Sequence, residues 1–271
     1  MAVGGHRWGA PGLGALSRPS SAGRVWTCFA VRSRDRLAVS LSAPAWDVRW
    51  RAGDAARLHQ SLPAACGARL VTLCRVSRPA LVLGSTQAQG DAALGGTAAT
   101  GIDVGRRRSG GGAVLVAPGQ LVWVEVHIER DDPLWEADVG RAFWWLGDVW
   151  ARALADLGIA AVEVHRGALV ATRWSSTVCF AGLGPGEVTA GTAKVVGLSQ
   201  RRTREGATFS CAALLDWEPG DLLDLLALEP EQRIEAAACL NRAATGLRAL
   251  VDRPAELTVS RVELAFLRRL V

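Results

Sequence analysis

The chain contains 271 residues and carries a formal net charge of +5 at pH 7, with 49% hydrophobic and 21% charged residues. This composition is typical of a soluble globular protein, and no apolar segment approaches the length of a membrane span. No basic run interleaved with aromatic residues suggests nucleic-acid binding, so we expect neither a membrane nor a nucleic acid as partner. The six cysteines are scattered without a Cys-x-x-Cys pair, which argues against a metal site and predicts free thiols in a cytoplasmic protein.

The N-terminal segment differs in composition from the rest of the chain. Residues 1–34 contain five arginines and no acidic residue, and Gly, Pro and Ser dominate up to Ser21. Such a segment buries too little apolar surface to fold. We therefore predict that residues 1–37 form a poorly ordered extension, and that residues 38–271 form a single domain that ends in helices.

Short apolar runs predict the first strands of this domain. Residues 70–76 and 81–84 flank the turn signal Arg78-Pro79 and are expected to be strands. Residues 113–117 and 121–128 are separated by Pro118-Gly119, and the second run alternates apolar residues with Trp, Glu and His. This pattern predicts a hairpin with a half-buried second strand and with His127 on its solvent face.

A helical period follows, because apolar residues recur every three or four positions over residues 137–157, and Gly158 is placed to end the helix. Further strands are expected at residues 159–164, 168–171, 194–199 and 207–214. Residues 221–228, 231–250 and 262–270 are expected to be helical. Strands and helices in irregular order predict an α+β fold with a mixed β-sheet and flanking helices.

Lys194 is the only lysine in a chain that has thirty arginines. A lysine that persists against this bias indicates a role that a guanidinium cannot fill, because the ammonium is a compact point charge whereas arginine is a planar fork. Lys194 is therefore a candidate functional residue.

A second candidate is the segment Arg-Arg-Arg-Ser-Gly-Gly-Gly-Ala-Val at residues 106–114. Three glycines in succession allow the backbone to approach a ligand and to direct several N–H groups at one anion. The flanking arginines can add charge-assisted hydrogen bonds to a phosphate or carboxylate. A glycine run is also common in a simple turn, and this one matches neither a P-loop nor a dinucleotide-binding motif.

Three segments together resemble one family. Residues 106–114 resemble the Arg-Arg-x-Ser-Gly-Gly-Gly-Ala-Val signature of the lipoate–protein ligase A and octanoyl transferase superfamily. Residues 194–202, Lys-Val-Val-Gly-Leu-Ser-Gln-Arg-Arg, resemble its Lys-x-x-Gly-x-x-Gln-Arg-Arg segment, and Lys194 falls on the family's catalytic lysine. Residues 81–87 resemble its strand ending in a Gly-x-x-Gln turn. The resemblance extends from about Leu70 to Trp217.

The resemblance implies a catalytic domain related to that of biotin ligases. It implies that lipoate or octanoate is joined to ATP, with Mg²⁺ as a possible companion, and that the acyl group then passes to a lysine of a lipoyl carrier domain. Such carriers are the lipoyl domains of 2-oxoacid dehydrogenases and the glycine cleavage H protein. Acyl carrier protein is a further partner that the resemblance allows. The protein itself is expected to be a monomer. Lys194 would be catalytic, and the acyl-adenylate pocket would be lined by Arg107, Ser109, Gly110, Gly111, Gly112 and Ala113.

Two departures from the family pattern leave alternatives open. Ligases commonly have an aromatic-His-Asp step after the glycines and a His-His-Gly element after the lysine strand. This chain has Leu-Val-Ala at residues 115–117 and an apolar segment at residues 209–214. The first alternative is an ATP-independent octanoyl transferase, because Cys179-Phe180 resembles the nucleophile region of cysteine-dependent family members. The second is a non-catalytic protein that binds the acyl group or the carrier.

Overall fold

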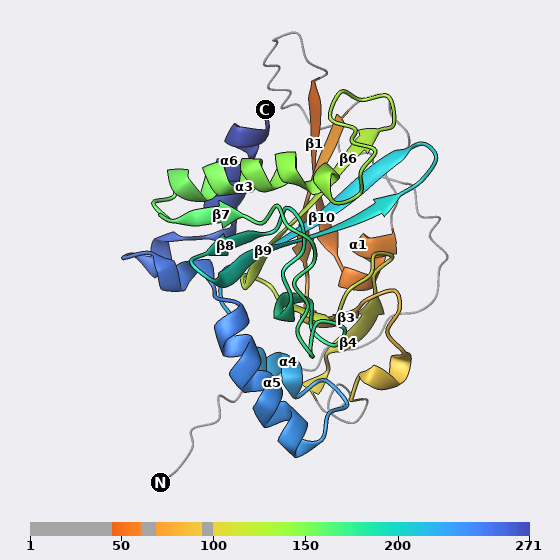
Figure 1. Ribbon diagram of the computed structural model, residues 1–271, viewed down its shortest axis with the longest axis vertical. Helices are drawn as coiled ribbons and strands as arrows, with labels where there is room; N and C mark the ends of the chain where they lie inside the picture. Colours follow the sequence, from red (N-terminus) through yellow and green to blue (C-terminus); the bar gives the residue numbers. More distant parts are fainter. Residues whose placement is uncertain (1–44, 61–68, 94–99) are drawn as a thin grey trace, which may run out of the picture. The chain divides into compact units, whose positions relative to one another are not determined.

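The structure is a computed structural model that describes residues 45–60, 69–93 and 100–271 (Figure 1). These residues belong to one compact unit, Val39–Val271. The extension predicted over residues 1–37 lies outside the described residues. Within the described part of the chain, no helix is long and apolar enough to cross a membrane.

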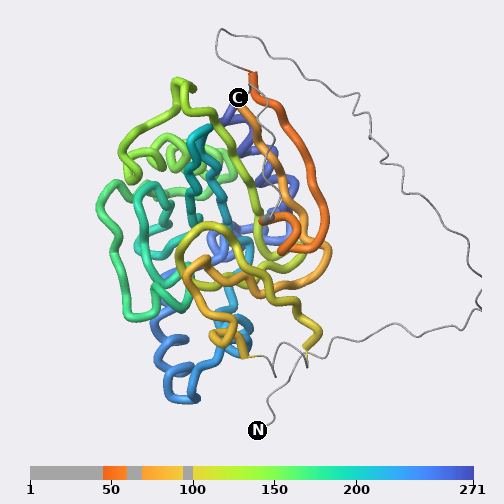
Figure 2. Tube along the Cα trace, turned by 90° about the vertical axis from the view of Figure 1, so that its right-hand side faces the viewer, coloured from red at the N-terminus to blue at the C-terminus, as the bar shows by residue number. Residues whose placement is uncertain are grey.

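A seven-stranded mixed sheet forms the centre of the fold. Its outermost strand β1 pairs with β2 in parallel, and every other neighbouring pair is antiparallel. Strands β1 and β2 run side by side in Figure 2. The strands in spatial order are β1 (Trp46–Gly53), β2 (Arg69–Val76), β6 (Leu121–Glu129), β10 (Gly206–Leu214), β9 (Ala193–Arg202), β8 (Val188–Ala190) and β7 (Val162–Val164). The predicted α+β fold with a mixed sheet is confirmed.

A second, three-stranded sheet has the order β4 (Asp103–Arg106), β3 (Ala80–Leu83) and β5 (Val114–Val116). The hairpin predicted over residues 113–128 is therefore wrong, since β5 belongs to the small sheet and β6 to the large one. The turn between them contains Gly119 at φ 78°. It carries the chain from one sheet to the other instead of reversing it within one sheet.

Two helices cover one face of the large sheet, α3 (Trp144–Asp156) and α6 (Val259–Leu270) (Figure 1). Trp150 of α3 and Phe266 of α6 are fully buried, and their rings lie 4.4 Å apart. These rings pack on the alternating valines of β6, so burial of this apolar face is the main driving force for this layer. The other face of the large sheet is left for the small sheet and the site.

The remaining helices pack around the small sheet. Helices α4 (Pro219–Leu223) and α5 (Pro230–Ala243) share a core cluster with Leu81 and Leu83 of β3. Helix α1 (Ala55–Gln60) packs Ala55 and Leu58 against the other side of β3. The small sheet thus lies between α1 on one side and α4 and α5 on the other.

Three predicted helix boundaries are wrong. In each case the backbone or a side chain near the boundary makes a hydrogen bond or β-bridge that a continued helix would not allow. The helix predicted over residues 137–157 begins at Trp144, after a 3-10 turn (Arg141–Phe143), because the Asp138 carboxylate accepts the N–H of Arg141. The helix predicted over residues 221–228 ends at Leu223, because Leu226 forms a β-bridge with Ala92. The helix predicted over residues 231–250 ends at Ala243, because Ala244 forms a β-bridge with Lys194.

Strand predictions also need correction at the short edge elements. The strand predicted over residues 159–164 begins only at Val162, after Ala161 with φ 54°. Residues 168–171 are not a strand, and only Val170 forms a bridge, with Leu183. Four elements were not predicted, namely β1, β4, β8 and α1.

Gly147 tests the packing of α3 on the edge of the large sheet. At an open helical position, Gly→Ala stabilises a protein by about 1 kcal/mol. A Cβ at position 147 would lie 2.3 Å from the carbonyl oxygen of Gly186, so we expect Gly147→Ala to destabilise the protein by about 2 kcal/mol instead. The helical control Gly220→Ala meets nothing within 4 Å and should be neutral or stabilising in urea unfolding. Equal effects of the two substitutions would contradict this packing.

Candidate functional site

A cavity lies between the two sheets and is lined by side chains from both. The small sheet contributes three valines, and the large sheet contributes residues of β6, β10 and β9. Its lining residues are His59, Val82, Arg107, Val114, Val116, Leu121, Trp123, Cys179, Gly197, Leu198, Ser199, Ser210, Cys211 and Ala212. The glycine-loop segment, the Cys179 turn and the strand that follows Lys194 therefore all reach one cavity.

The strand register explains the shape of the cavity floor. Gly197 of β9 and Trp123 of β6 both pair with Ala212 of β10, so they form one row across three strands. A second row consists of Ser199, Ser210 and Glu125. The positions on β9 and β10 are small, whereas both positions on β6 are large. The floor is consequently open over two strands and blocked at the third.

The glycine loop is held against β3 by main-chain contacts. The guanidinium of the buried Arg107 donates to the carbonyl oxygens of Gly110 and Gly112, at 2.9 and 2.7 Å. A Cβ on Gly84 would lie 1.8 Å from the carbonyl oxygen of Gly111, and one on Gly112 would lie 2.3 Å from the nitrogen of Val178. Among the predicted loop glycines, Gly112 is thus required by close backbone packing and Gly111 is favoured by its φ of 94°, whereas Gly110 faces open space.

The third motif, the Gly-x-x-Gln turn at residues 84–87, supports the glycine loop by hydrogen bonds. The N–H of Gly84 donates to the side-chain oxygen of Gln87 at 2.9 Å, and the amide of Gln87 donates to the carbonyl oxygen of Thr177. Ala113 donates its N–H to the same carbonyl oxygen. The Gly-x-x-Gln turn therefore ties the glycine loop to the segment that leads into Cys179.

The glycine loop also contacts the lysine strand. The hydroxyls of Ser109 and Ser199 lie 3.0 Å apart, which places the first predicted motif beside the second. Arg201 follows Ser199 by two positions on the same strand, and its Nη1 is buried with no hydrogen-bond partner among the described residues. A buried, unpaired guanidinium N–H fits an anionic ligand group. Arg201 was not among the predicted site residues, although it lies within the Gln-Arg-Arg run.

Lys194 is buried, with 2% of its surface exposed. Its ammonium lies 2.7 Å from the Glu187 carboxylate and donates to the carbonyl oxygens of Cys179 and Gly182, at 2.9 and 3.0 Å. It also lies 4.8 Å from the ring centroid of Phe180. These partners match the three N–H groups of an ammonium. Glu187 was not predicted, because a lone acidic residue in a glycine-rich loop gives no sequence signal.

The Lys-x-x-Gly spacing follows from this burial. A Cβ on Gly197 would lie 3.2 Å from the Phe180 ring and 3.3 Å from Cε of Lys194. Both distances are tighter than ordinary van der Waals contact, so a larger residue at 197 would press on the lysine chain. The glycine leaves room for Lys194 to reach Glu187.

Cys179 begins a 3-10 turn (Cys179–Ala181) beside the glycine-loop strand. Its N–H donates to the carbonyl oxygen of Ala113, and the residue is half-buried on the cavity wall. Lys194 contacts the carbonyl oxygen of this residue. Burial raises the pKa of the Cys211 thiol to about 12 and also raises the pKa of Cys74, so those two thiols are poor nucleophiles.

The end of the cavity floor on β6 holds a polar cluster that the sequence did not predict. Oε1 of Glu125 accepts hydrogen bonds from Nε1 of Trp123 and from the Ser210 hydroxyl, at 2.9 and 2.7 Å. The His59 ring lies 4.1 Å from the Trp123 ring. Burial raises the pKa of Glu125 to about 7, while burial and the charge of Arg107 lower the pKa of His59 to about 3.

His127 lies on the same face and was predicted to face solvent. It is instead half-buried, its Nδ1 lies 3.1 Å from the Thr208 hydroxyl, and burial lowers its pKa. The polar face of β6 is therefore an interior surface, which corrects the prediction for this strand.

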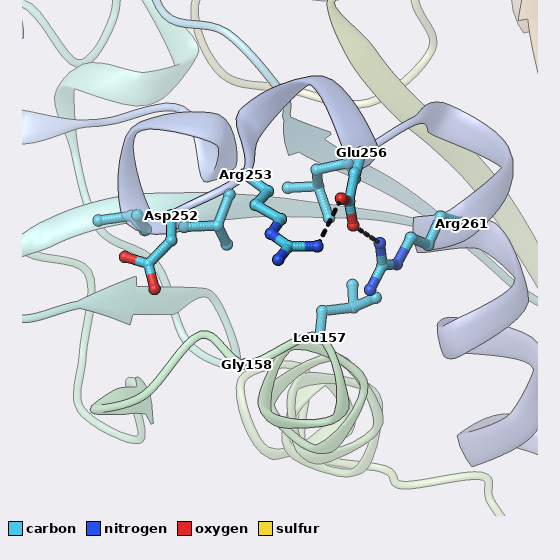
Figure 3. Close-up of a pocket in the computed structure, with 9 residues that line it drawn as sticks. Leu157, Gly158, Asp252, Arg253, Glu256 and Arg261 are labelled. Atoms are coloured by element: carbon cyan, nitrogen blue, oxygen red, sulfur yellow. Dashed lines mark hydrogen bonds and ion pairs between the residues drawn. The ribbon is translucent and has the colours of Figure 1, made fainter.

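A separate cavity of about 230 Å³ lies beside the end of α3 (Figure 3). It is bordered by Leu157, Gly158 and residues 250–261 and shares no residue with the cavity between the sheets. Its two arginines, Arg253 and Arg261, both pair with Glu256. None of the three predicted motifs reaches this cavity.

The sequence matches the family model of the lipoyl protein ligase A/B catalytic domain over residues 55–271. The chain belongs to this family. The resemblance inferred from the three motifs is therefore confirmed. No curated protein sequence is significantly similar to the chain.

Solved structures of lipoate–protein ligases share the fold. A bi-partite lipoate protein ligase from Thermoplasma acidophilum, studied with its E2 lipoyl domain, has a TM-score of 0.63 at 16% identity, covering 82% of this chain and 80% of that one. Lipoate-protein ligase A bound with ATP has a TM-score of 0.61 at 17% identity, with coverages of 84% and 83%. A lipoic acid complex of protein Ta0514 from T. acidophilum, a proposed ligase, has a TM-score of 0.57 at 17% identity, with coverages of 78% and 74%.

Glu125 makes the stability of this lipoyl ligase family member depend on pH. Because its pKa rises from 4.5 to about 7 on folding, the folded state keeps a proton that the unfolded state has lost, and stability falls as pH rises through this interval. Glu125→Gln keeps an oxygen for both donors and removes the titration. We expect the stability of wild type relative to this variant to fall by about 3 kcal/mol between pH 4.5 and 7.

Urea unfolding of both proteins across this pH range measures the difference. His59 has a lowered pKa and contributes the opposite slope, but it is present in both proteins and cancels in the comparison. Parallel stability curves would contradict the assignment to Glu125.

Proposed function

We propose that the protein attaches a lipoyl or octanoyl group to a lysine of a lipoyl carrier domain. The observation that carries the proposal is the cavity in which the glycine-loop segment, Cys179 and the strand after Lys194 meet. The valines of the small sheet give this cavity of about 50 Å³ an apolar wall that an acyl chain can contact once neighbouring side chains move to admit it. The Ser199 hydroxyl on the cavity wall, which contacts the Ser109 hydroxyl, is suited to the reacting carboxyl end.

The favoured route activates the acyl group with ATP, which supplies a phosphate-linked leaving group when it is bound. Arg201 fits the α-phosphate, because its Nη1 is buried and has no protein partner among the described residues. Arg107 does not fit that role, since its guanidinium is used by carbonyl oxygens of the glycine loop. It shapes the loop, and Arg201 provides the charge.

Lys194 would stabilise the negative charge that develops when the carrier amine attacks the acyl carbonyl. The ammonium is held 2.9 Å from the Cys179 carbonyl oxygen, on the cavity-lining turn. To reach substrate, it would exchange one of its two main-chain acceptors for the acyl oxygen and retain its ion pair with Glu187. An arginine is planar and too large for this enclosed position.

A second candidate route uses Cys179, and the half-buried position of this residue in the cavity wall favours it. The Cys179 sulfur would attack an octanoyl thioester of a carrier protein, and the carrier thiol would leave with the proton. The amine of the target lysine would then attack the new thioester, forming an amide and releasing the Cys179 thiol. This route needs no ATP.

The proposed partner is a lipoyl carrier domain of a 2-oxoacid dehydrogenase or of the glycine cleavage H protein. The T. acidophilum neighbour was studied with its E2 lipoyl domain, and other neighbours were solved with ATP or lipoic acid. These ligands and this partner support the choice of substrates for the first assay.

Intact-mass spectrometry tests the two routes. If Cys179 is the nucleophile, incubation with an octanoyl carrier protein without ATP adds one octanoyl group to the protein. Hydroxylamine then removes this adduct, and Cys179→Ser does not form it. If the adenylate route operates, the apo-carrier gains mass only when lipoate and ATP are present, and Arg201→Gln raises the KM for ATP by about tenfold. No mass change on any carrier under either condition would refute the proposed function.

Lys194 tests whether the protein is a catalyst or only a binding protein. Lys194→Met should abolish transfer and cost about 3–5 kcal/mol of stability, because it leaves the Glu187 carboxylate buried without its cation. The double variant Lys194→Met with Glu187→Gln removes both charges and keeps an amide oxygen for a main-chain N–H, so it should recover much of that stability and remain inactive. Transfer at the wild-type rate in the folded double variant would show that Lys194 is not catalytic, whereas a wild type that binds the carrier without any transfer would support the non-catalytic reading.

A further inference from the structure

The cavity floor is open at one end and closed at the other. In the two rows that cross the floor, β9 and β10 contribute Gly197, Ser199, Ser210 and Ala212, all of them small. On β6 the same two rows continue with Trp123 and Glu125, whose side chains are large. The change from small to large residues occurs at one strand boundary, between β10 and β6.

Trp123 is fixed in this closing position by two contacts and by burial. Its indole N–H donates to Glu125, its ring faces the His59 ring, and only 4% of its surface is exposed. Glu125 is itself held by the Ser210 hydroxyl from the neighbouring strand. An indole held by a hydrogen bond and by ring packing has little freedom to rotate away from an incoming chain.

The position of this wall sets a length. Neighbouring strands are about 4.8 Å apart, so the floor from β9 to β6 spans about 10 Å. Cys179 and Ser199 lie at the β9 end, where the proposed acyl transfer takes place. An acyl chain that starts at this end and runs across the strands therefore meets the Trp123 ring after a medium chain length.

We propose that Trp123, held by Glu125 and His59, is the specificity-determining residue that sets the upper limit of acyl-chain length. The inference rests on the proposed function, because it identifies the cavity as the acyl site. It adds to that function the residue that ends the cavity and so limits the length of the chain. Longer saturated chains are excluded by the indole ring.

The test compares chain-length profiles by isothermal titration calorimetry with hexanoate, octanoate, decanoate and dodecanoate, and by transfer assays with the same acyl groups. Wild type should prefer octanoate and reject dodecanoate. Trp123→Ala should improve dodecanoate relative to octanoate by at least about tenfold, since each added methylene then finds apolar space. The matched control Trp46→Ala removes a partly buried strand tryptophan from the helix-covered face and should leave the profile unchanged.

A second substitution tests the same cavity floor without creating a new cavity. Ala212→Leu places a branched side chain between Gly197 and Trp123 and should weaken octanoate by at least about tenfold while hexanoate is affected less. Circular dichroism confirms that each variant is folded. If Trp123→Ala does not fold, Trp123→Leu provides the shorter side chain at the same position, and Ala212→Leu decides the outcome independently.

The outcomes separate the inference from the proposed function. A shift toward longer chains in Trp123→Ala, absent in Trp46→Ala, supports the end wall even if no transfer occurs, in which case only the proposed function fails. If wild type is active and its chain-length profile is the same as those of Trp123→Ala and Trp46→Ala, the inference is overturned and the proposed function stands. A wild type that binds no acid of any length overturns the inference as well.

Discussion

The ion pair between Lys194 and Glu187 is the interaction on which the arrangement of the site depends. Two buried charges 2.7 Å apart are tolerated only when their remaining hydrogen-bonding groups are satisfied. Glu187 meets this condition by accepting the N–H groups of Gly184 and Leu198, and Lys194 by donating to Cys179 and Gly182. The pair thereby fastens the Cys179 turn to β9 and determines where one wall of the cavity stands.

A second constraint is the close approach of backbone to backbone around the glycine loop. The contacts of Gly84 with Gly111, and of Gly112 with Val178, leave no space for a Cβ. Arg107 then bridges the loop carbonyls that this approach brings together. The loop is consequently rigid before any ligand arrives, as a site that must hold a small reacting group in place requires.

Sequence patterns predicted the parts of the fold that depend on local period and on motif spacing. The central strands and the α+β class follow from such patterns, whereas the placement of the glycine loop and Lys194 in one site was implied only by the family resemblance of their motifs. The pairing of β5 with β6 could not be predicted correctly, because alternating residues look the same whether two strands pair with each other or enter separate sheets. Glu187, Arg201 and the pair formed by Trp123 and Glu125 were missed, because their importance comes from strand register and burial, which single residues do not reveal.

The burial of Lys194 has a consequence for the chemistry of the whole chain. The sequence contains no other lysine, and this one is 2% exposed and occupied by its ion pair. An enzyme that binds an activated acyl group can acylate its own exposed lysines, because they are nearer to the group than the lysines of other proteins. Arginine side chains stay protonated and do not act as acyl acceptors at neutral pH. The surface therefore offers no lysine side chain for self-acylation, and under the proposed function an activated acyl group would have no competing lysine acceptor on this chain.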